Sequence, residues 1–318
     1  MVKEKIGIIG AGPIGSIMAA CLSRHKEKVY LADIKKDLID QIKNQGLRVT
    51  GILGDFHTKM TDVCYSISEL SKFDINLLFI AVKTSALEVV TKEIEKIFNP
   101  QMKIIALQNG IDNEDLLANY FGQENVFRIV VNYAGNMHKP GIVEITFFHP
   151  PNYIGGLSEK TKDTAKEIAN LISNSGLKTE FSDEIKKHEW RKTILNAGLS
   201  PVCAITGLTM KEAMELKETR YLCEKILQES IKVAEKIGYD YGEDFYEKCI
   251  SYLTTAGYHK PSMLIDLEQG NPTEIDFINQ KIIYYGKKTK VPTPYLDSLT
   301  NIIKVMEYRA KEKKNKRN

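Results

Sequence analysis

The chain has 318 residues, of which 43% are hydrophobic and 27% are charged, the ordinary composition of a globular protein. Its formal net charge is +3, from 44 basic and 41 acidic residues, and this balance argues against a polyanion such as nucleic acid as partner. Six basic residues but only one acidic residue lie in the tail, 309–318, so the rest of the chain is close to neutral. The length predicts about two domains.

The cysteines, the histidines and the N-terminus bear on the compartment. Five cysteines are present, and none has the C-x-x-C spacing of a zinc or redox site. We therefore expect the cysteines to be buried free thiols in a reducing compartment. The six histidines are scattered, so we expect no metal site. Glycines and a proline break the apolar N-terminal run, and no apolar run reaches the ~18 residues of a membrane helix. We therefore expect a soluble, cytoplasmic protein with no membrane partner.

Short apolar runs alternate with helical patterns in the first part of the chain. Four short, mostly apolar runs predict buried strands, at 5–9, 28–32, 75–82 and 102–107. Each is followed by a segment of helical period, at 14–24, about 36–44, 86–98 and 113–121. Apolar strands separated by amphipathic helices are typical of a parallel sheet covered on both faces. The sequence thus predicts a doubly wound α/β domain.

The pattern changes from about Phe127. Strand-like runs at 126–131, 142–148 and 153–154 predict a mixed or antiparallel extension of the sheet, followed by a helix (161–175) and a strand (177–181). Ser182-Asp183-Glu184 is typical of a helix N-cap and first turn. Only helical periods follow, at 184–199, 209–237, 243–255, 275–286 and from about 295 onward. We expect one domain at 1–181 and an all-helical domain at 182–318.

A glycine-rich turn joins the first strand to the first helix, with the sequence Gly10-Ala11-Gly12-Pro13-Ile14-Gly15. In this context the G-x-G-x-x-G spacing is typical of a Rossmann dinucleotide-binding turn. Gly10 permits the tight turn, Gly12 lets the backbone approach a pyrophosphate, and Gly15 lets the helix pack on the strand. Pro13 suits the first helical turn, where its missing N–H is not needed. We expect all six residues to contact the cofactor.

Asp33 ends the second predicted strand. An acidic side chain at this place accepts hydrogen bonds from the adenosine ribose hydroxyls. Its charge repels a 2′-phosphate, and the next residue is Ile34, not an arginine. The sequence therefore favours NAD(H) over NADP(H). Lys35 and Lys36 could instead hold a phosphate, so NADP(H) stays open as an alternative.

Four further motifs follow the glycine turn. Two lie where predicted parallel strands end, Ala81-Val82-Lys83-Thr84 and Leu107-Gln108-Asn109-Gly110, which is where ligands bind in open α/β sheets. In the helical part, Lys192 and Asn196 are four residues apart and share one helix face. The last motif is Pro261-Ser262-Met263-Leu264-Ile265-Asp266, with Asn271-Pro272-Thr273-Glu274-Ile275-Asp276 after it.

The chain resembles the ketopantoate reductase (2-dehydropantoate 2-reductase) family, as far as about Tyr295. Four features together carry the resemblance: the glycine turn, W-R-K with an asparagine four residues beyond its lysine, P-S-M-L-x-D and T-E-I-D. The resemblance implies NAD(P)H-dependent reduction of 2-dehydropantoate to (R)-pantoate, on the route to pantothenate and coenzyme A. It also implies a Rossmann domain joined to a helical domain like that of 6-phosphogluconate dehydrogenase. A substrate site in the cleft between the domains and a homodimer are further implications.

The resemblance implies roles for single residues as well. Lys192 matches the family's catalytic lysine, a general acid that also contacts the substrate; a ketone that accepts a hydride needs such a proton at its oxygen. Asn196 and Ser262 match substrate-binding residues, and Glu274 matches a glutamate near the lysine and the cofactor. The other matched positions are Asn109 for substrate and nicotinamide ribose, Lys83 and Ala134 for the cofactor, and Ser200 for the substrate.

Three positions depart from the family pattern. Ser200 and His259 stand where many members have asparagine, and Asp33-Ile34 stands where members that use NADP place an arginine. Two alternatives therefore stay open. One is an NAD-dependent D-2-hydroxyacid dehydrogenase of the same family that acts on a bulkier 2-keto acid. The other is a dinucleotide-binding sensor without turnover, which would have no need of Lys192 or Glu274.

Overall fold

The computed structural model describes residues 4–315, apart from the side chain of residue 315. The chain forms two compact units. Unit 1 comprises the residues up to Gln108 together with Asp112–His188, and unit 2 comprises Asn109–Ile111 together with the residues from Glu189 onward. The chain passes from unit 1 to unit 2 for the last time between His188 and Glu189, inside a helix. The sequence analysis placed the start of the second domain at residue 182.

Unit 1 contains an eight-stranded sheet in the order β12-β11-β8-β7-β6-β1-β2-β5. Neighbouring strands are parallel except β8 and β11, which are antiparallel. The chain order reverses between β1 and β6, as in a doubly wound, Rossmann-like sheet, so the expected fold class is confirmed. The strands are β1 (Lys5–Ile9), β2 (Lys28–Ala32), β5 (Asp62–Cys64), β6 (Leu77–Ile80), β7 (Lys103–Ala106), β8 (Val126–Val130), β11 (Asn152–Gly156) and β12 (Thr179–Phe181).

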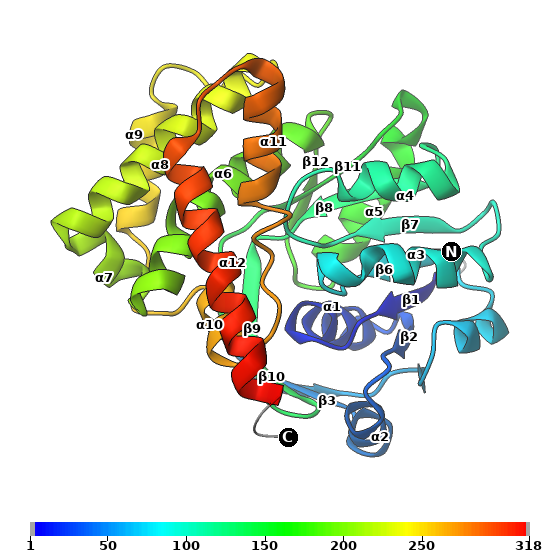
Figure 1. The fold of residues 1–318 in the computed structure, drawn as a ribbon. Coiled ribbons are helices and arrows are strands. Elements are labelled where there is room, and N and C mark those ends of the chain that lie inside the picture. Colours follow the sequence, from blue (N-terminus) through cyan, green and yellow to red (C-terminus); the bar gives the residue numbers. More distant parts are fainter. Residues whose placement is uncertain (1–3, 316–318) are drawn as a thin grey trace. The chain divides into compact units, whose positions relative to one another are not determined.

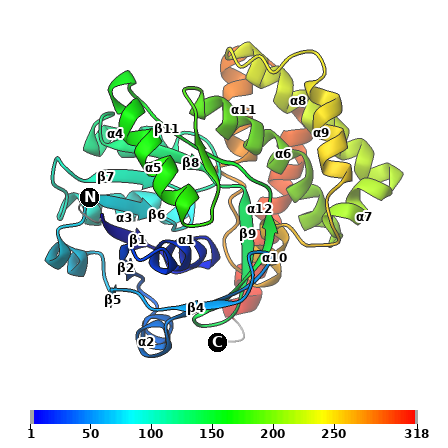
Figure 2. The same cartoon turned by 180° about the vertical axis from the view of Figure 1, so that it is seen from behind.

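Helices cover both faces of this sheet because its strands are apolar on both sides. Ile8 packs in the core cluster that contains α1 and α5, whereas its neighbour Ile9 packs in the cluster that contains α3 and α4. The first pair of helices faces the viewer in Figure 2 and the second pair in Figure 1. The helices of unit 1 are α1 (Pro13–Arg24), α2 (Lys36–Gln45), α3 (Leu87–Glu95), α4 (Asn113–Phe121) and α5 (Lys162–Asn174), with short 3-10 turns at Ser68–Phe73, Thr84–Ala86 and Glu159–Thr161.

A second, four-stranded sheet in unit 1 corrects one expectation. The run 142–148 does not extend the main sheet. As β10 (Ile142–Phe148) it pairs antiparallel with β9 (Tyr133–Lys139) and parallel with β3 (Leu47–Gly51), and β4 (Phe56–Thr58) lies beyond β3. The sequence pattern missed β3, β4 and β9 because these strands are short or half exposed and carry polar residues among the apolar ones.

Unit 2 is helical in its described part. It contains α6 (Ile185–Thr206) from Glu189 onward, followed by α7 (Met210–Glu215), α8 (Lys217–Lys236), α9 (Phe245–Thr254), α10 (Ser262–Glu268), α11 (Asn279–Thr289) and α12 (Pro294–Asn315). The predicted cap before α6 is displaced: Ser182 Oγ accepts a hydrogen bond from Glu184 N at 3.1 Å, but α6 begins only at Ile185 and has no acidic residue in its first turn. α12 carries the basic tail as far as Asn315; positions 316–318 lie outside the described residues.

Four sequence-based expectations for the helices need correction. α6 continues through Pro201 to Thr206, because burial of the next residues outweighs the one backbone hydrogen bond that a proline removes. The run 209–237 forms two helices, since Leu216 has an extended backbone. α11 begins only at Asn279, after a turn that contains Glu274, and α10 was not predicted at all.

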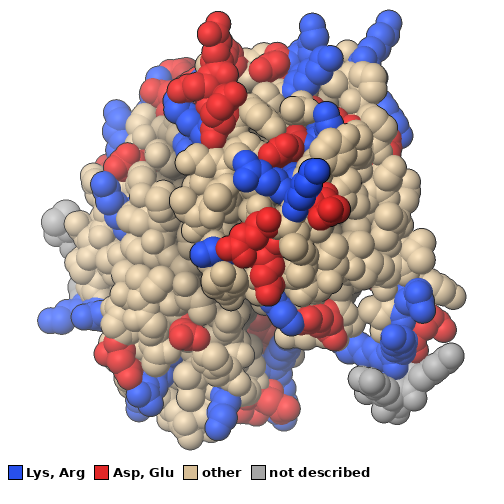
Figure 3. Space-filling view, turned by 90° about the vertical axis from the view of Figure 1, so that its left-hand side faces the viewer, with Lys and Arg blue, Asp and Glu red and all other residues tan. Residues whose placement is uncertain are grey.

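The structure also bears on the expectations for surface charge, cysteines, membrane helices and metal sites. On the face shown in Figure 3, basic and acidic side chains are interspersed. The five cysteines are free and buried, as expected. Among residues 4–315, no helix is long and apolar enough to cross a membrane. The same residues contain no group of three or more His, Cys, Asp or Glu side chains that could hold a metal ion.

Candidate functional site

The glycine turn of unit 1 has a backbone that its glycines require. Gly10 has a φ of +102°, and a Cβ at this position would lie 2.9 Å from the Ala81 carbonyl carbon at the end of β6. A Cβ on Gly15 would overlap the Gly10 carbonyl oxygen. A Cβ on Gly12, by contrast, would meet no atom within 4 Å. Gly10 and Gly15 are thus required by the protein itself, whereas Gly12 borders open space at the start of α1, where N–H groups can bind a phosphate.

Asp33 lies beside this turn. Its Oδ2 accepts a hydrogen bond from Ala11 N at 2.8 Å, and its Oδ1 accepts one from Lys35 N at 2.9 Å. A carboxylate oxygen has two lone pairs, so both oxygens can accept a further bond from ribose hydroxyls. Ile34 is 86% exposed and makes no polar contribution. The turn and the carboxylate together fit the pyrophosphate and adenosine ribose of a dinucleotide.

Two other residues matched to the cofactor lie in unit 1. Lys83 is exposed and directly precedes the 3-10 turn after β6, at the carboxyl edge of the sheet. Ala134 is exposed on β9. The strand is fixed near the glycine turn because the hydroxyl of the preceding residue, Tyr133, donates to Ile14 O at 3.2 Å. The segments that carry both residues therefore border the glycine turn, one through Ala81 and the other through Tyr133.

Unit 2 brings three of the residues matched to the substrate, and Glu274, around one cavity. Asn196 and Ser200, from successive turns of α6, face it together with Ser262 of α10 and Glu274 from the turn before α11. The space between the side chains is about 10 Å³, enough for about one water molecule. A small organic acid needs more room, so its binding requires these side chains to separate.

Asn109 belongs to the same unit. Its Nδ2 donates a hydrogen bond to Glu274 Oε2 at 3.0 Å, although the two residues are 165 positions apart. The glutamate therefore has the cavity on one side and an amide that holds its carboxylate on another. This pairing joins a strand-end motif to a motif in the helical part, which the sequence analysis placed in separate domains.

Lys192 lies on α6 one turn before Asn196 and is half-buried. The register of α6 is fixed by Trp190, which is 2% exposed and packs against the rings of Tyr285 and Tyr239, with centroids 5.2 and 5.8 Å away. Because residues 192, 196 and 200 follow at helical spacing, the lysine lies along the helix face that reaches the cavity. It does not line the cavity itself.

Sequence reasoning missed three residues that line the cavity: Met263, Asp266 and Ile278. A helical-spacing signal was available for two of them. Asp266 lies four residues after Ser262 on α10, and Ile278 lies four residues after Glu274, so each pair shares one face of a helical turn. Asp266 adds a second carboxylate to the cavity, and the other two supply its apolar part.

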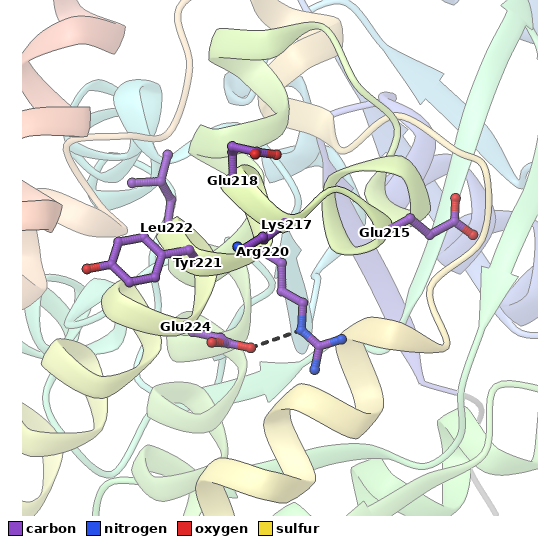
Figure 4. A pocket seen from close by; sticks show the side chains of 7 residues that line it. All are labelled: Glu215, Lys217, Glu218, Arg220, Tyr221, Leu222 and Glu224. Carbon is purple, nitrogen blue, oxygen red and sulfur yellow. Dashed lines mark hydrogen bonds and ion pairs between the residues drawn. The ribbon is translucent and has the colours of Figure 1, made fainter.

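A larger hollow on unit 2 lies elsewhere and contains none of the matched residues. It is an open surface depression over α7 and α8, lined by Glu215, Lys217, Glu218, Arg220, Tyr221, Leu222 and Glu224 (Figure 4). Two of its charged side chains pair with each other, Arg220 Nε with Glu224 Oε1 at 2.9 Å. This arrangement is typical of a solvated helix face, so size alone does not make it the candidate site.

Two family models match the chain over most of its length. The model described as "Ketopantoate reductase PanE/ApbA" matches residues 6–159, and the model described as "Ketopantoate reductase PanE/ApbA C terminal" matches residues 184–307. A 2-dehydropantoate 2-reductase of Lactococcus lactis is 30% identical over 97% of this chain and 100% of its own length. The chain belongs to the ketopantoate reductase family. This is a family of oxidoreductases that bind nicotinamide dinucleotides, and the resemblance seen in the motifs is confirmed.

Solved structures of this family are similar along the whole chain. A D-mandelate dehydrogenase in complex with NADH and anilino(oxo)acetate has a TM-score of 0.88 and 28% identity, over 96% of this chain and 98% of the other. A 2-dehydropantoate 2-reductase of Geobacter metallireducens has a TM-score of 0.87 and 25% identity, over 94% and 98%. Proteins named for two different activities are thus about equally similar to this one.

Proposed function

We propose that this protein is an NAD(P)H-dependent 2-dehydropantoate 2-reductase, which reduces ketopantoate to (R)-pantoate. The observation that carries the proposal is the cavity of unit 2. Three residues matched to the substrate line it, Asn196, Ser200 and Ser262, together with Glu274, which is matched to a glutamate near the lysine and the cofactor; the four come from three separate segments of the chain. Asn109 is attached to the same group through its hydrogen bond to Glu274.

The proposed reaction adds a hydride to the C2 carbonyl carbon and a proton to its oxygen. The reduced nicotinamide, when bound, supplies the hydride. Lys192 donates the proton from its ammonium group to the oxygen, and its positive charge stabilises the negative charge that develops there. Ser262 donates a hydrogen bond to the substrate carboxylate. Asn196, one turn from the lysine on the same helix, orients the lysine or a substrate hydroxyl.

The polar lining favours a hydroxylated keto acid over an unsubstituted one. Ketopantoate carries a hydroxyl group that 2-ketoisovalerate and phenylglyoxylate lack. Asn196, Ser200 and Asp266 line the cavity and can accept a hydrogen bond from such a hydroxyl. A site built to bond a hydroxyl discriminates strongly against analogues without it, because its polar groups are then left unpaired.

Steady-state kinetics with three substrates tests this choice. We expect kcat/KM for ketopantoate to exceed the values for 2-ketoisovalerate and phenylglyoxylate by at least about 10²-fold. A preference for phenylglyoxylate would instead identify a D-2-hydroxyacid dehydrogenase, the alternative that the similarity to D-mandelate dehydrogenase supports. If no 2-keto acid supports oxidation of NADH or NADPH, the protein is a dinucleotide-binding sensor and the proposed function is wrong.

We further propose that NADH is the preferred cofactor. Asp33 lies beside the glycine turn, and its negative charge opposes a 2′-phosphate. The variant Asp33→Asn removes the charge and keeps one acceptor oxygen for the backbone N–H groups of Ala11 or Lys35. We expect the ratio of kcat/KM for NADH over NADPH to fall by about tenfold or more in this variant. A wild-type enzyme that prefers NADPH would contradict the proposal.

A further inference from the structure

The connection between β7 and α4 contains a three-residue segment that belongs to the other compact unit. β7 ends at Ala106 and α4 begins at Asn113, and both elements belong to unit 1. Between them, Asn109–Ile111 belongs to unit 2. Hydrogen bonds within unit 2 hold this segment in place.

The segment is held at two points by one helical turn. The turn is closed by Phe277 N and Ile278 N, which both donate to Glu274 O at 3.0 Å. Glu274 Oε2 accepts from Asn109 Nδ2 at 3.0 Å, and Phe277 O accepts from Ile111 N at 3.2 Å. One contact is through side chains and the other is through the backbone, and Gly110 lies between them.

Gly110 allows this close approach. It is buried and has a φ of +95°, a backbone angle that residues other than glycine rarely adopt. A Cβ at this position would lie 2.5 Å from Phe277 O and 3.1 Å from the Phe277 carbonyl carbon. Both are backbone atoms of a closed turn, so they cannot rotate away as a flexible side chain would. Any larger residue must therefore push the segment away from the turn.

We propose that Gly110 and the Phe277 carbonyl group form a docking point that positions the Asn109 amide against the Glu274 carboxylate. Gly110 and Phe277 are then positioning residues, which act on the reaction through Asn109 and Glu274. The inference rests on the proposed function, since it assigns these two side chains to the site of that reaction. Misplacement of a reacting or orienting group by about 1 Å can lower a rate by about 10²-fold.

The variant Gly110→Ala tests the docking point, with Gly176→Ala as its matched control. Gly176 has a φ of +99°, but a Cβ there would meet no atom within 4 Å. Both variants carry the same backbone strain, and only Gly110→Ala pushes the segment from Phe277. We expect kcat/KM for ketopantoate to fall at least about tenfold further in Gly110→Ala than in the control. Equal kcat/KM in the two variants would overturn the proposal.

A double-mutant cycle separates positioning from a general structural effect. If Gly110 acts through Asn109, then Gly110→Ala should lower kcat/KM by no more than about twofold when it is added to Asn109→Ala. The same substitution added to the wild type should have its full effect. Losses that simply multiply in the double variant would show that Gly110 does not act through Asn109.

Amide hydrogen exchange tests the docking point without turnover. The Ile111 amide should exchange slowly in the wild type and in Gly176→Ala, and at least about tenfold faster in Gly110→Ala. A wild-type Ile111 amide that exchanges at the rate of an open loop would overturn the proposal, whether or not the variants fold. If no 2-keto acid is reduced, the proposed function fails by itself, and exchange still decides whether the segment is docked.

Discussion

The glycine turn of unit 1 and the cavity of unit 2 are specified by different physical means. In unit 1, the nucleotide turn depends on backbone sterics, since Gly10 and Gly15 leave no room for a side chain. In unit 2, the cavity depends on side chains from three segments, 196–200, 262–266 and 274–278, with Asn109 attached to the last. A rule about glycine is local and can be read from six residues. A cavity assembled from distant segments exists only after the helices have packed.

The largest effect should follow from removal of the proton donor in unit 2. Lys192→Ala should lower kcat for ketopantoate on the order of 10²-fold or more, because general acid catalysis is lost. The affinity for NADH should stay unchanged, since the glycine turn and Asp33 lie in the other unit. Lys187→Ala is a suitable control, because this lysine precedes it on α6 and pairs with Glu184 at 3.5 Å. A Lys192→Ala variant with near-normal turnover would remove the lysine from the mechanism.

The next effect tests unit 1 by comparing two glycines of one turn. Gly12 has a φ of −68° and open space around its missing Cβ, so Gly12→Ala should leave the melting temperature of the free protein unchanged. It should weaken NADH binding by about tenfold or more, because the added methyl group occupies the place of the pyrophosphate. Gly15→Ala should lower the melting temperature even without nucleotide, since α1 must move away from the Gly10 carbonyl group.

Thermal unfolding with and without NADH measures both effects. A bound ligand raises stability by about 2.7 kcal/mol at 100 times its Kd, so a variant that cannot bind loses this increment. Normal NADH stabilisation of Gly12→Ala would mean that the open space beside Gly12 does not receive the pyrophosphate.

The same contrast explains what could be predicted from the sequence. The glycine turn follows from local rules. Asp33 could be placed because strand ends lie at one edge of a parallel sheet. The cavity residues Asn196, Ser262 and Glu274 were reached only through the family resemblance, because nothing local distinguishes them from surface residues. The hydrogen bond between Asn109 and Glu274 could not be predicted from the sequence, since it joins residues 165 positions apart. It forms because the segment Asn109–Ile111 belongs to unit 2.

Errors in the fold have the same origin. The run 142–148 was assigned to the main sheet because its true partner, β3, was not recognised: it has only five residues, and polar Arg48 and Thr50 alternate with the apolar ones, so the signal is short. The predicted helical segment 184–199 stops before Pro201, although the buried residues after this proline continue α6 to Thr206. In both places tertiary packing overrides a local signal.

The smallest expected effect concerns the thiols, which allow the two units to be compared away from the site. Burial raises the pKa of Cys21 and Cys203 to about 12 and that of Cys249 to about 11. Since the thiolate is the reactive form, none of the five cysteines should react with iodoacetamide at pH 8 in the native protein. Reaction should require unfolding, and mass spectrometry can then assign each labelled cysteine to its unit.

Labelling in increasing urea makes this a test of coupling between the units. Cys21 and Cys64 report on unit 1, whereas Cys203, Cys223 and Cys249 report on unit 2. Because NADH binds through the glycine turn, it should raise the urea midpoint for labelling of the first group more than that of the second. Equal shifts for all five cysteines would show that the two units unfold as one. The segment Asn109–Ile111, which belongs to unit 2 but lies in the chain between two parts of unit 1, would then be part of a single cooperative structure.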